Sequence, residues 1–277
     1  MKTSKSQQSV LDQDSLRERV RERYGAIATK GTEGCCGPEA ESCCGSQADP
    51  LLESPTAAEQ LGYESTDTAS MPEGSEIGLG CDNPVALASI KAGERILDLG
   101  SGGGFDCFLA ARQTGPTGHV IGVDMTPAMI SKARRNAAKG GFDNVAFRLG
   151  EIEYLPVADA CIDIILSNCV INLSPDKPQV FAEAFRVLVP GGRLAISDIV
   201  LLQELPEDIR EDFEAYTGCV AGAMTVDELK NMLQAAGFNE PDIKIKPGSR
   251  EFINRWVPGK NVGDYVASAS ITARKPI

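Results

Sequence analysis

Cysteine is the residue type in this sequence with the widest choice of chemistry. The 277 residues contain nine cysteines. Two adjacent pairs, Cys35–Cys36 and Cys43–Cys44, lie in the stretch EGCCGPEAESCCGS, which has almost no apolar residues to bury them. Three more, Cys81, Cys169 and Cys219, stand among Gly, Asn and Ser residues at the ends of predicted elements. This set of thiols predicts binding of a metal or metalloid, or redox chemistry.

Other familiar uses of cysteine fit poorly. The C-C-x₆-C-C spacing of the two pairs is not the C-x-x-C spacing of zinc sites. The sequence has a single histidine, His119, at the start of a predicted strand, which nearly excludes Ser-His-Asp hydrolysis and multi-histidine zinc catalysis. Cys107 and Cys161 fall inside a helix pattern and a strand pattern, and we expect them to be small buried residues.

A glycine-rich turn is the second feature with chemical meaning. In LDLGSGGGFD, residues 97–106, the acidic Asp98 is followed by glycines at alternate positions, Gly100, Gly102 and Gly104. The spacing is not the G-x-G-x-x-G of dinucleotide-binding proteins. Glycine permits positive φ and lets a ligand approach the backbone, so the turn predicts a binding site at the end of a strand.

The next two strand ends carry residues that suit a nucleoside. Asp124 ends the second strand, where a carboxylate can accept from both hydroxyls of a ribose. Glu151 and Ile152 follow the third strand, where Glu151 could accept from an exocyclic amine and Ile152 could cover an adenine face. Together the strand ends predict a nucleoside-containing ligand.

The elements that must position these residues alternate along the chain. From Glu94 onward, short apolar runs (RILDLG, HVIGVD, NVAFRLG, CIDIILSN, RLAISDIV) are separated by amphipathic helix patterns. This alternation is typical of βαβ units and a parallel sheet with helices on both faces. DIKIKP and YVASASITARK are predicted to be closing strands.

Helices are predicted on either side of this core. A helix is predicted over residues 15–27, with Leu16, Val20, Tyr24 and Ile27 in one apolar stripe and Asp14 as N-cap. A short helix is predicted from Pro55 to about Leu61. Further helices are predicted near 207–217 and 225–236, the second capped by Thr225 and stopped by Gly237. We expect three parts: an N-terminal helix and cysteine-rich lid (1–80), a ligand-binding core (81–205), and a C-terminal region that completes the sheet (206–277).

Charge and hydropathy exclude several classes of partner. With 27 Lys+Arg against 39 Asp+Glu, the net charge is −12, which argues against nucleic acid or an anionic membrane. No run of about 18 apolar residues is present, and the N-terminus lacks the apolar run of a secretion signal. The sequence therefore predicts a cytoplasmic protein, in a compartment where thiols stay reduced.

Over residues 94–200 the sequence resembles the class I S-adenosylmethionine-dependent methyltransferases. The resemblance is carried by LDLGSGGG, GVDMTPAMI, GEIEYLP and VLVPGGRLAISD. It implies a Rossmann-like α/β fold, with a mostly parallel seven-stranded sheet and helices on both faces, and a bound S-adenosylmethionine. The candidate donor-binding residues are Asp98, Gly100, Ser101, Gly102, Gly104, Asp124, Met125, Glu151, Ile152 and Asn168.

The cysteines at the ends of predicted elements, Cys81, Cys169 and Cys219, then indicate which compound accepts the methyl group. Two or three thiolates beside a methyl donor select a soft ion. Trivalent arsenic fits, because it binds thiolates and keeps a lone pair that is itself the nucleophile. No general base is needed, in agreement with the scarcity of histidine.

The resemblance then narrows to the arsenite methyltransferases, prokaryotic branch. It rests on GLGCDNP, SNCVINL, YTGC and the cysteine pairs after ERYGAIA. It implies Cys169 and Cys219 as the arsenic ligands, with Cys81 as a third catalytic cysteine. Cys81 and one of Cys35, Cys36, Cys43 or Cys44 would complete binding or form a disulfide. It also implies an external thiol reductant, of thioredoxin or glutathione type.

Two other functions compete with arsenite methylation. A methyltransferase for a small organic acceptor, such as a quinone or sterol, also fits the fold. It gives no reason for the thiols of Cys81, Cys169 and Cys219. A non-catalytic, thiol-rich metalloid-binding protein is the third hypothesis, and an intact donor site argues against it.

Overall fold

The structure is a computed structural model. It describes residues 5–29, 62–63, 71–72, 74–77, 80–210, 212, 215–216, 218–254, 256 and 260–277, with side chains from residue 13 onward. The four N-terminal cysteines and the helix predicted from Pro55 lie outside the described residues.

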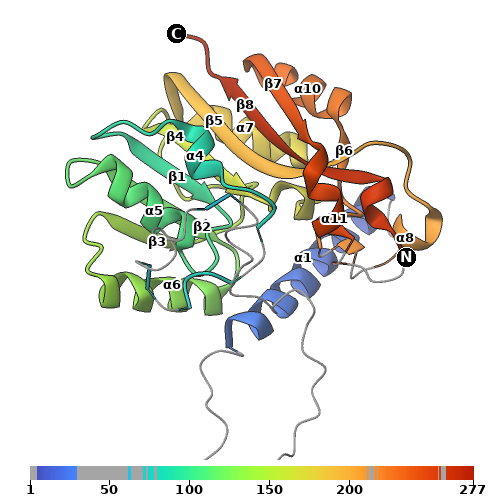
Figure 1. Cartoon of the computed structure of the whole chain (residues 1–277), viewed down its shortest axis with the longest axis horizontal. Helices are drawn as coiled ribbons and strands as arrows, with labels where there is room; N and C mark the ends of the chain where they lie inside the picture. The colour runs from blue at the N-terminus through green and yellow to red at the C-terminus, as the bar shows by residue number, and fades with distance from the viewer. Residues whose placement is uncertain are drawn as a thin grey trace, which may run out of the picture.

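One mixed sheet forms the centre of the molecule (Figure 1), in the order β3-β2-β1-β4-β5-β8-β7. The first five strands along the chain are parallel to one another, and β8 and β7 add antiparallel strands beside β5. The strands are β1 (Arg95–Leu99), β2 (His119–Asp124), β3 (Val145–Leu149), β4 (Ile162–Asn168), β5 (Leu188–Leu201), β7 (Asn239–Lys246) and β8 (Val266–Arg274). The predicted α/β fold with a mostly parallel sheet is confirmed.

The predicted count of seven strands is wrong, because the sheet has eight in the part of the chain that the structure describes. The additional strand, β6 (Met224–Thr225), pairs with Val200 and Leu201 at the end of β5. Strand β4 ends at Asn168, opposite Ser197, so the last residues of β5 have an edge that β4 does not cover. A two-residue strand leaves no periodicity in the sequence to detect.

Helices cover both faces of the sheet, as predicted. Alternate β1 residues point to opposite faces, so Ile96 joins one apolar core while Leu97 and Leu99 join another. The first core is closed by α4 (Pro84–Ala88), α5 (Phe105–Thr114) and α6 (Pro127–Gly140). The second is closed by α7 (Lys177–Val187) and α10 (Val226–Ala235).

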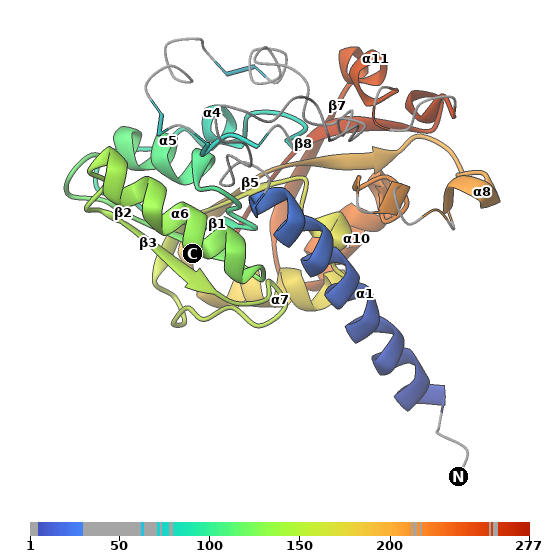
Figure 2. The ribbon, with the colours of Figure 1, turned by 90° about the horizontal axis from the view of Figure 1, so that it is seen from below.

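The N-terminal helix α1 (Lys5–Thr29) is longer than predicted. Asp14 lies inside it, paired with Arg17, so its prediction as N-cap is wrong. The sequence KSQQSVLDQ before Asp14 has no Gly or Pro that would prevent the helix from starting earlier. Ile27 and Ala28 pack against Met129, so α1 lies beside α6 (Figure 2).

The helices after β5 follow the prediction in part. Helix α8 (Glu207–Arg210) is shorter than the predicted 207–217, because the chain leaves the helix at Asp212, whose carboxylate accepts from the N–H of Ala215. The N-cap of α10 is confirmed: Thr225 and Glu228 form a capping box. The chain turns at Gly237, with φ of 100°.

Short helical segments complete the chain: η1 (Ile171–Leu173) after β4, then η2 (Pro247–Ser249), α11 (Arg250–Ile253) and η3 (Val262–Asp264) between β7 and β8. None of the helices in the described part of the chain combines the length and apolar character needed to cross a membrane.

Candidate active site

A cavity opens at the carboxyl ends of β1, β2 and β4, and we refer to it as the donor cavity. It encloses about 1170 Å³ of space, its open mouth included. Most of the candidate donor-binding residues line it: Asp98, Gly100, Ser101, Gly102, Asp124, Met125, Ile152 and Asn168. Its position agrees with the rule that open α/β sheets bind ligands beyond the carboxyl ends of their strands.

The glycine-rich turn requires glycine for conformation and for space. Gly100, Gly102 and Gly104 have φ of 68°, 49° and 95°. A Cβ atom on Gly100 would lie 2.4 Å from a methyl carbon of Val170. Gly104 does not line the cavity but occupies the N-cap of α5, against Phe108. Gly100 and Gly102 thus line the cavity at positions where a side chain would be strained and would crowd Val170 or Ile77.

Two buried hydroxyl groups in the cavity wall fit a polar ligand. The Oγ atoms of Ser75 and Ser101 have no hydrogen-bond partner among the described residues, and both side chains line the cavity. Buried hydroxyls are normally hydrogen-bonded, so these two atoms are available to a ligand. Asp124 binds the turn itself, accepting from Gly102 N at 3.0 Å and from Thr126 N at 2.8 Å.

An acidic pair, Asp98 and Asp106, lies in the wall of the donor cavity. Burial raises the pKa of Asp98 well above its usual range and the pKa of Asp106 to about 6. Asp106 accepts from the Tyr63 hydroxyl at 2.6 Å, which lowers its pKa in part. Cys107, buried as predicted, donates its thiol hydrogen to Asp98 at 3.2 Å. We had not predicted Asp106 or Tyr63. Asp106 could have been found as an acidic residue in the first turn of α5.

Asn168 connects Asp106, one member of this acidic pair, to Cys81. Its Nδ2 donates to the Asp82 carbonyl (2.8 Å), the Tyr63 hydroxyl (3.1 Å) and Asp106 (3.2 Å). Its Oδ1 accepts from Cys81 N at 3.0 Å. The end of β4 and the loop before α4 are therefore joined by one side chain.

Helix α1 covers part of the donor cavity. Arg17, Val20 and Tyr24 line the cavity from this helix. Arg21 donates to the Met125 carbonyl (3.2 Å) and pairs with Glu151 (3.2 Å). The Glu151 carboxylate is thus held by α1 and is not part of the cavity wall, so its predicted contact with an adenine amine stays a prediction.

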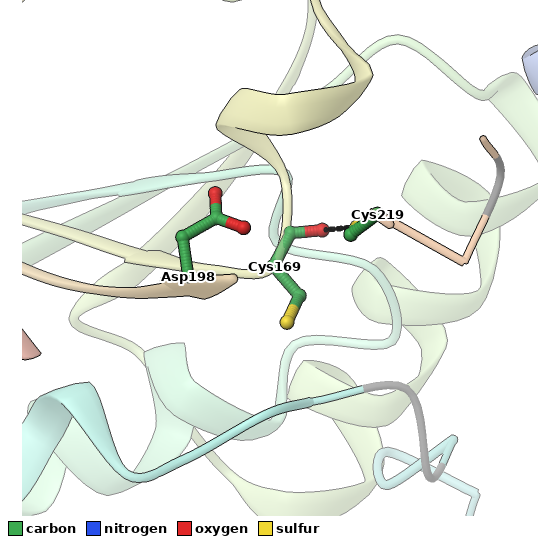
Figure 3. Close-up of side chains that lie close together, drawn as sticks. All are labelled: Cys169, Asp198 and Cys219. Atoms are coloured by element: carbon green, nitrogen blue, oxygen red, sulfur yellow. Dashed lines mark hydrogen bonds between the residues drawn. The ribbon is translucent and has the colours of Figure 1, made fainter. Parts of the chain in front are cut away.

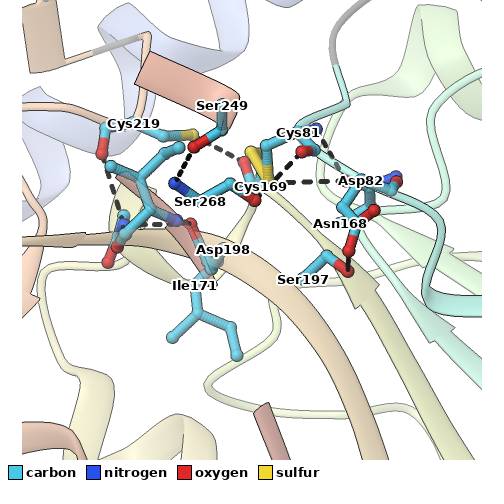
Figure 4. Close-up of a disulfide and its surroundings, with 12 residues drawn as sticks. Cys81, Asp82, Asn168, Cys169, Ile171, Ser197, Asp198, Cys219, Ser249 and Ser268 are labelled. Carbon is cyan, nitrogen blue, oxygen red and sulfur yellow. Dashed lines mark hydrogen bonds between the residues drawn. A yellow bond between two sulfur atoms is a disulfide. The ribbon is translucent and has the colours of Figure 1, made fainter. Parts of the chain in front are cut away.

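Cys81, Cys169 and Cys219 lie together beside the donor cavity, although 138 residues separate the first from the last. Cys81 and Cys169 form a disulfide (Figure 4), with their Cα atoms 6.0 Å apart. Ser268, on β8, donates to the Cys81 carbonyl at 3.0 Å. Cys81, Cys169 and Cys219 pack in one buried cluster, the cysteine cluster. Cys169 also lines the donor cavity.

Cys219 is oriented toward Cys169 (Figure 3). Its thiol donates to the Cys169 carbonyl at 2.6 Å. Cys169 and Cys219 have φ of 55° and 62°, a left-handed conformation that is uncommon outside glycine and recurs at functional sites. Burial raises the pKa of Cys219 well above its usual range, and the nearby Asp198 raises it further. Cys219 is therefore a neutral thiol in the absence of a soft ion.

A carboxylate that we had not predicted as a ligand completes this group. The ligand atoms of Cys169, Asp198 and Cys219 all lie within 4.8 Å of one another, and the three side chains are buried. Burial raises the pKa of Asp198 to about 7, against hydrogen bonds that lower it. Asn172 donates to Asp198 at 2.9 Å and to the Cys219 carbonyl at 3.2 Å. Asp198 is an acidic residue inside the apolar run of β5, between Ser197 and Ile199, which is a signal that the sequence could have supplied.

Comparison with known proteins agrees with this site. A family model described as "Methyltransferase domain" matches residues 90–237. The arsenite methyltransferase of Halobacterium salinarum is 52% identical over 278 aligned residues, which cover 96% of this chain and 68% of that protein. The human arsenite methyltransferase is 44% identical over 155 residues, 53% of this chain and 41% of the human protein.

A solved structure is similar as well. The crystal structure of CrArsM, an arsenic(III) S-adenosylmethionine methyltransferase from Chlamydomonas reinhardtii, superposes with a TM-score of 0.58 at 33% identity. The superposed residues cover 80% of this chain and 74% of the CrArsM chain. On the sequence match, the family model and this structural likeness, the chain belongs to the arsenite methyltransferases, within the class I methyltransferase fold.

Proposed function

We propose that the protein transfers methyl groups from S-adenosylmethionine to trivalent arsenic. One observation carries this proposal: Cys169 lines the donor cavity and also lies within ligand distance of Cys219. The names of the relatives, arsenite methyltransferases from an archaeon and from mammals, support the same acceptor. In this proposal residues 81–205 bind the donor, 206–277 supply Cys219, and 1–80 cover the site.

The cysteines would hold arsenic as two As–S bonds. Two hydroxyl groups of arsenite are exchanged for the sulfurs of Cys169 and Cys219, and the two thiol hydrogens leave with them as water. The neutral thiol of Cys219 therefore brings its own proton to the leaving oxygen. The bound donor supplies a methyl group activated by its sulfonium sulfur, and the arsenic lone pair accepts it. Placing the two reactants in line is the main task of the protein.

The remaining donor contacts are assigned by the same proposal. We assign Asp124 to the ribose hydroxyls, with Met125 next to it in the chain, and Ile152 to the adenine end of the donor. Asp98, Asp106 and Asn168 would hold the amino-acid end, because the ammonium group of the donor needs anionic or acceptor groups. Ser101 and Ser75 offer the two buried hydroxyls that lack a protein partner.

The Cys81–Cys169 disulfide must be reduced before Cys169 can bind arsenic. An external thiol would do this by exchange, becoming a disulfide itself. Each methylation also raises arsenic formally from As(III) to As(V), and two electrons from thiols return it. We therefore propose a thioredoxin- or glutathione-type reductant as partner, and the cytoplasm, whose thiol pool is reducing, as the compartment.

The N-terminal cysteines give a first prediction. Changing Cys35, Cys36, Cys43 and Cys44 together to serine should leave donor affinity unchanged and slow arsenite methylation more than methylation of methylarsenite. The reason is that tethered thiols raise the local thiol concentration for capture of arsenite. Rates on both substrates, measured side by side, check this. Equal effects on the two rates would make these cysteines irrelevant to capture.

The pKa of Asp106 gives a second prediction. A cationic ammonium group binds best when this carboxyl is ionised, so donor affinity should fall as pH drops through about 6. At pH 5 about a tenth of the groups remain ionised, so affinity should fall by up to roughly tenfold relative to pH 7. Calorimetric titration with S-adenosylhomocysteine checks this. Asp106→Asn should bind more weakly at pH 7 and lose the pH dependence, and an unchanged pH profile in that variant would contradict the assignment.

One acceptor assay tests the proposed function. The reduced protein is incubated with S-adenosylmethionine and either arsenite or a panel of quinones and sterols, and formation of S-adenosylhomocysteine is measured. We expect product only with the trivalent arsenical. Turnover with an organic acceptor and none with arsenite would overturn the proposal.

A further inference from the structure

We propose that the aromatic ring of Tyr24 contacts the positively charged sulfonium of the bound donor. Tyr24 is then a specificity-determining residue of the donor cavity. It favours S-adenosylmethionine, which carries this charge, over the product S-adenosylhomocysteine, whose sulfur is neutral, and so helps the product to leave. The inference rests on the proposed function for the place of the acceptor beside Cys169.

Tyr24 lies where the donor cavity and the cysteine cluster meet. Among the described residues, five line the cavity and also pack in or against the cluster: Val20, Tyr24, Met125, Cys169 and Leu173. The sulfonium belongs at this boundary, because its methyl group passes to an acceptor held beside Cys169. Tyr24 is the one aromatic residue among the five, and an aromatic face attracts a cation placed over it.

The charges around Tyr24 agree with this position. Burial raises the pKa of Tyr24 well above its usual range. Cys219 raises it further and Arg23 opposes this increase, while Asp124 and Asp198 add smaller increases. Asp124 belongs to the donor side of the boundary, whereas Cys219 and Asp198 belong to the cysteine side, so the hydroxyl is within electrostatic reach of both. The side chain is therefore a neutral phenol at pH 7, with the negative ring face that a cation prefers.

Helix α1 holds Tyr24 in place from both directions along the chain. One turn before it, Val20 is buried in the cysteine cluster. One turn after it, Ile27 packs against α6. Beside it, the helix approaches the start of α6 closely, since a Cβ on Gly25 would lie 3.9 Å from the methyl carbon of Thr126. Contact with the sulfonium therefore costs little ordering of the ring.

Other aromatic side chains near the site are placed differently. In the described part of the chain, Tyr63 and Phe105 line the cavity but do not pack against the cysteine cluster. Their rings contact each other, with centroids 5.0 Å apart, and the Tyr63 hydroxyl donates to Asp106. Tyr216 packs against the cluster but does not line the cavity, and its hydroxyl donates to the Leu173 carbonyl at 2.9 Å.

The test compares the affinities for two ligands that differ in the methyl group and its charge. Tyr24→Leu and Tyr24→Phe are titrated by calorimetry with S-adenosylmethionine and with S-adenosylhomocysteine, without arsenic. Leucine keeps an apolar contact but has no π face. We expect Tyr24→Leu to lower the affinity for S-adenosylmethionine, relative to that for S-adenosylhomocysteine, roughly tenfold to thirtyfold, as a desolvated cation–π contact would. Tyr24→Phe keeps the ring and should keep the ratio within about twofold.

Tyr216→Leu is the matched control, because it removes an aromatic ring from the same cluster but not from the cavity wall. Its ratio of affinities should equal that of the parent, since a general loosening of the cavity weakens both ligands alike. An unchanged ratio in Tyr24→Leu would overturn the proposal. An equal fall in Tyr24→Phe would overturn it too, because the hydroxyl would then carry the preference.

A second measurement keeps the shape of the ring, in case Tyr24→Leu binds neither ligand. In the Tyr24→Phe protein, stepwise fluorination of the introduced ring withdraws electron density from its face. Affinity for S-adenosylmethionine should fall with each fluorine while affinity for S-adenosylhomocysteine stays constant, and an affinity that does not respond to fluorination would contradict the proposal. These titrations contain no acceptor, so failure to methylate arsenite would defeat the proposed function separately.

Discussion

Replacing Cys169 or Cys219 with serine is expected to abolish arsenite methylation while donor affinity stays within about twofold of the parent. Changing a residue that merely orients a metal ligand typically lowers affinity or activity 10–100-fold, so loss of a ligand itself should exceed roughly 100-fold. Serine keeps the size of the side chain, but its hard oxygen is a poor ligand for a soft ion. Rates with arsenite and titration with S-adenosylhomocysteine check the two halves of this result.

Two further cysteine variants test whether the loss of activity is specific to Cys169 and Cys219. Cys161→Ser removes a partly buried thiol that bonds the Ala158 carbonyl, far from the donor cavity, and should behave as the parent. Cys81→Ser removes the disulfide but leaves the Cys169–Cys219 pair, so it should still perform one turnover when supplied reduced. Parental rates in both Cys169→Ser and Cys219→Ser would end the assignment of these cysteines as ligands.

Gly100→Ala should weaken donor binding about 100-fold or more and lower the stability of the protein. A non-glycine residue in the left-handed region costs about 1–2 kcal/mol. The added Cβ would also lie 2.4 Å from Val170, and overpacking of this kind costs about 1–3 kcal/mol. Together these amount to roughly 2–5 kcal/mol. Part of this free-energy cost comes from distortion of the turn that lines the donor cavity. The rest comes from displacement of Val170, which follows Cys169.

Gly248→Ala is the matched control for this change. Nothing lies within 4 Å of a Cβ built on Gly248. Donor affinity and melting temperature of this control should equal those of the parent. If Gly100→Ala binds S-adenosylhomocysteine as tightly as the parent does, the turn is not the donor site.

The core of the fold was predictable because its parallel strands are short, largely apolar runs, and two of them end in a polar residue. RILDLG, HVIGVD and CIDIILSN became β1, β2 and β4, and Asp124 and Asn168 lie at strand ends as expected. The carboxyl ends of parallel strands meet at one edge of the sheet, so residues identified singly could be placed in one site. Cys169, directly after β4, followed from the same rule.

The remaining features depend on contacts between distant parts of the chain. Arg21 and Glu151, 130 residues apart, hold α1 over the donor cavity, and neither residue is unusual in its own segment. The group of Asp198, Asn172 and Cys219 brings together β5, η1 and the segment before β6. The role of Asp106 appears only when burial and its contact with Tyr63 are known. The sequence marks Asp106 and Asp198 as acidic residues in notable places, but it does not show which distant residues they contact.

The central claim, that this protein moves a methyl group onto arsenic, is tested most directly by following the methyl group itself. The reduced protein is given arsenite, a dithiol and S-adenosylmethionine with a deuterated methyl group, and the arsenic species are separated and weighed by mass spectrometry. We predict methylated arsenicals that carry the label, with one S-adenosylhomocysteine formed for each methyl transferred. Unlabelled arsenite as the sole arsenic species, from protein shown to bind the donor, would contradict the account.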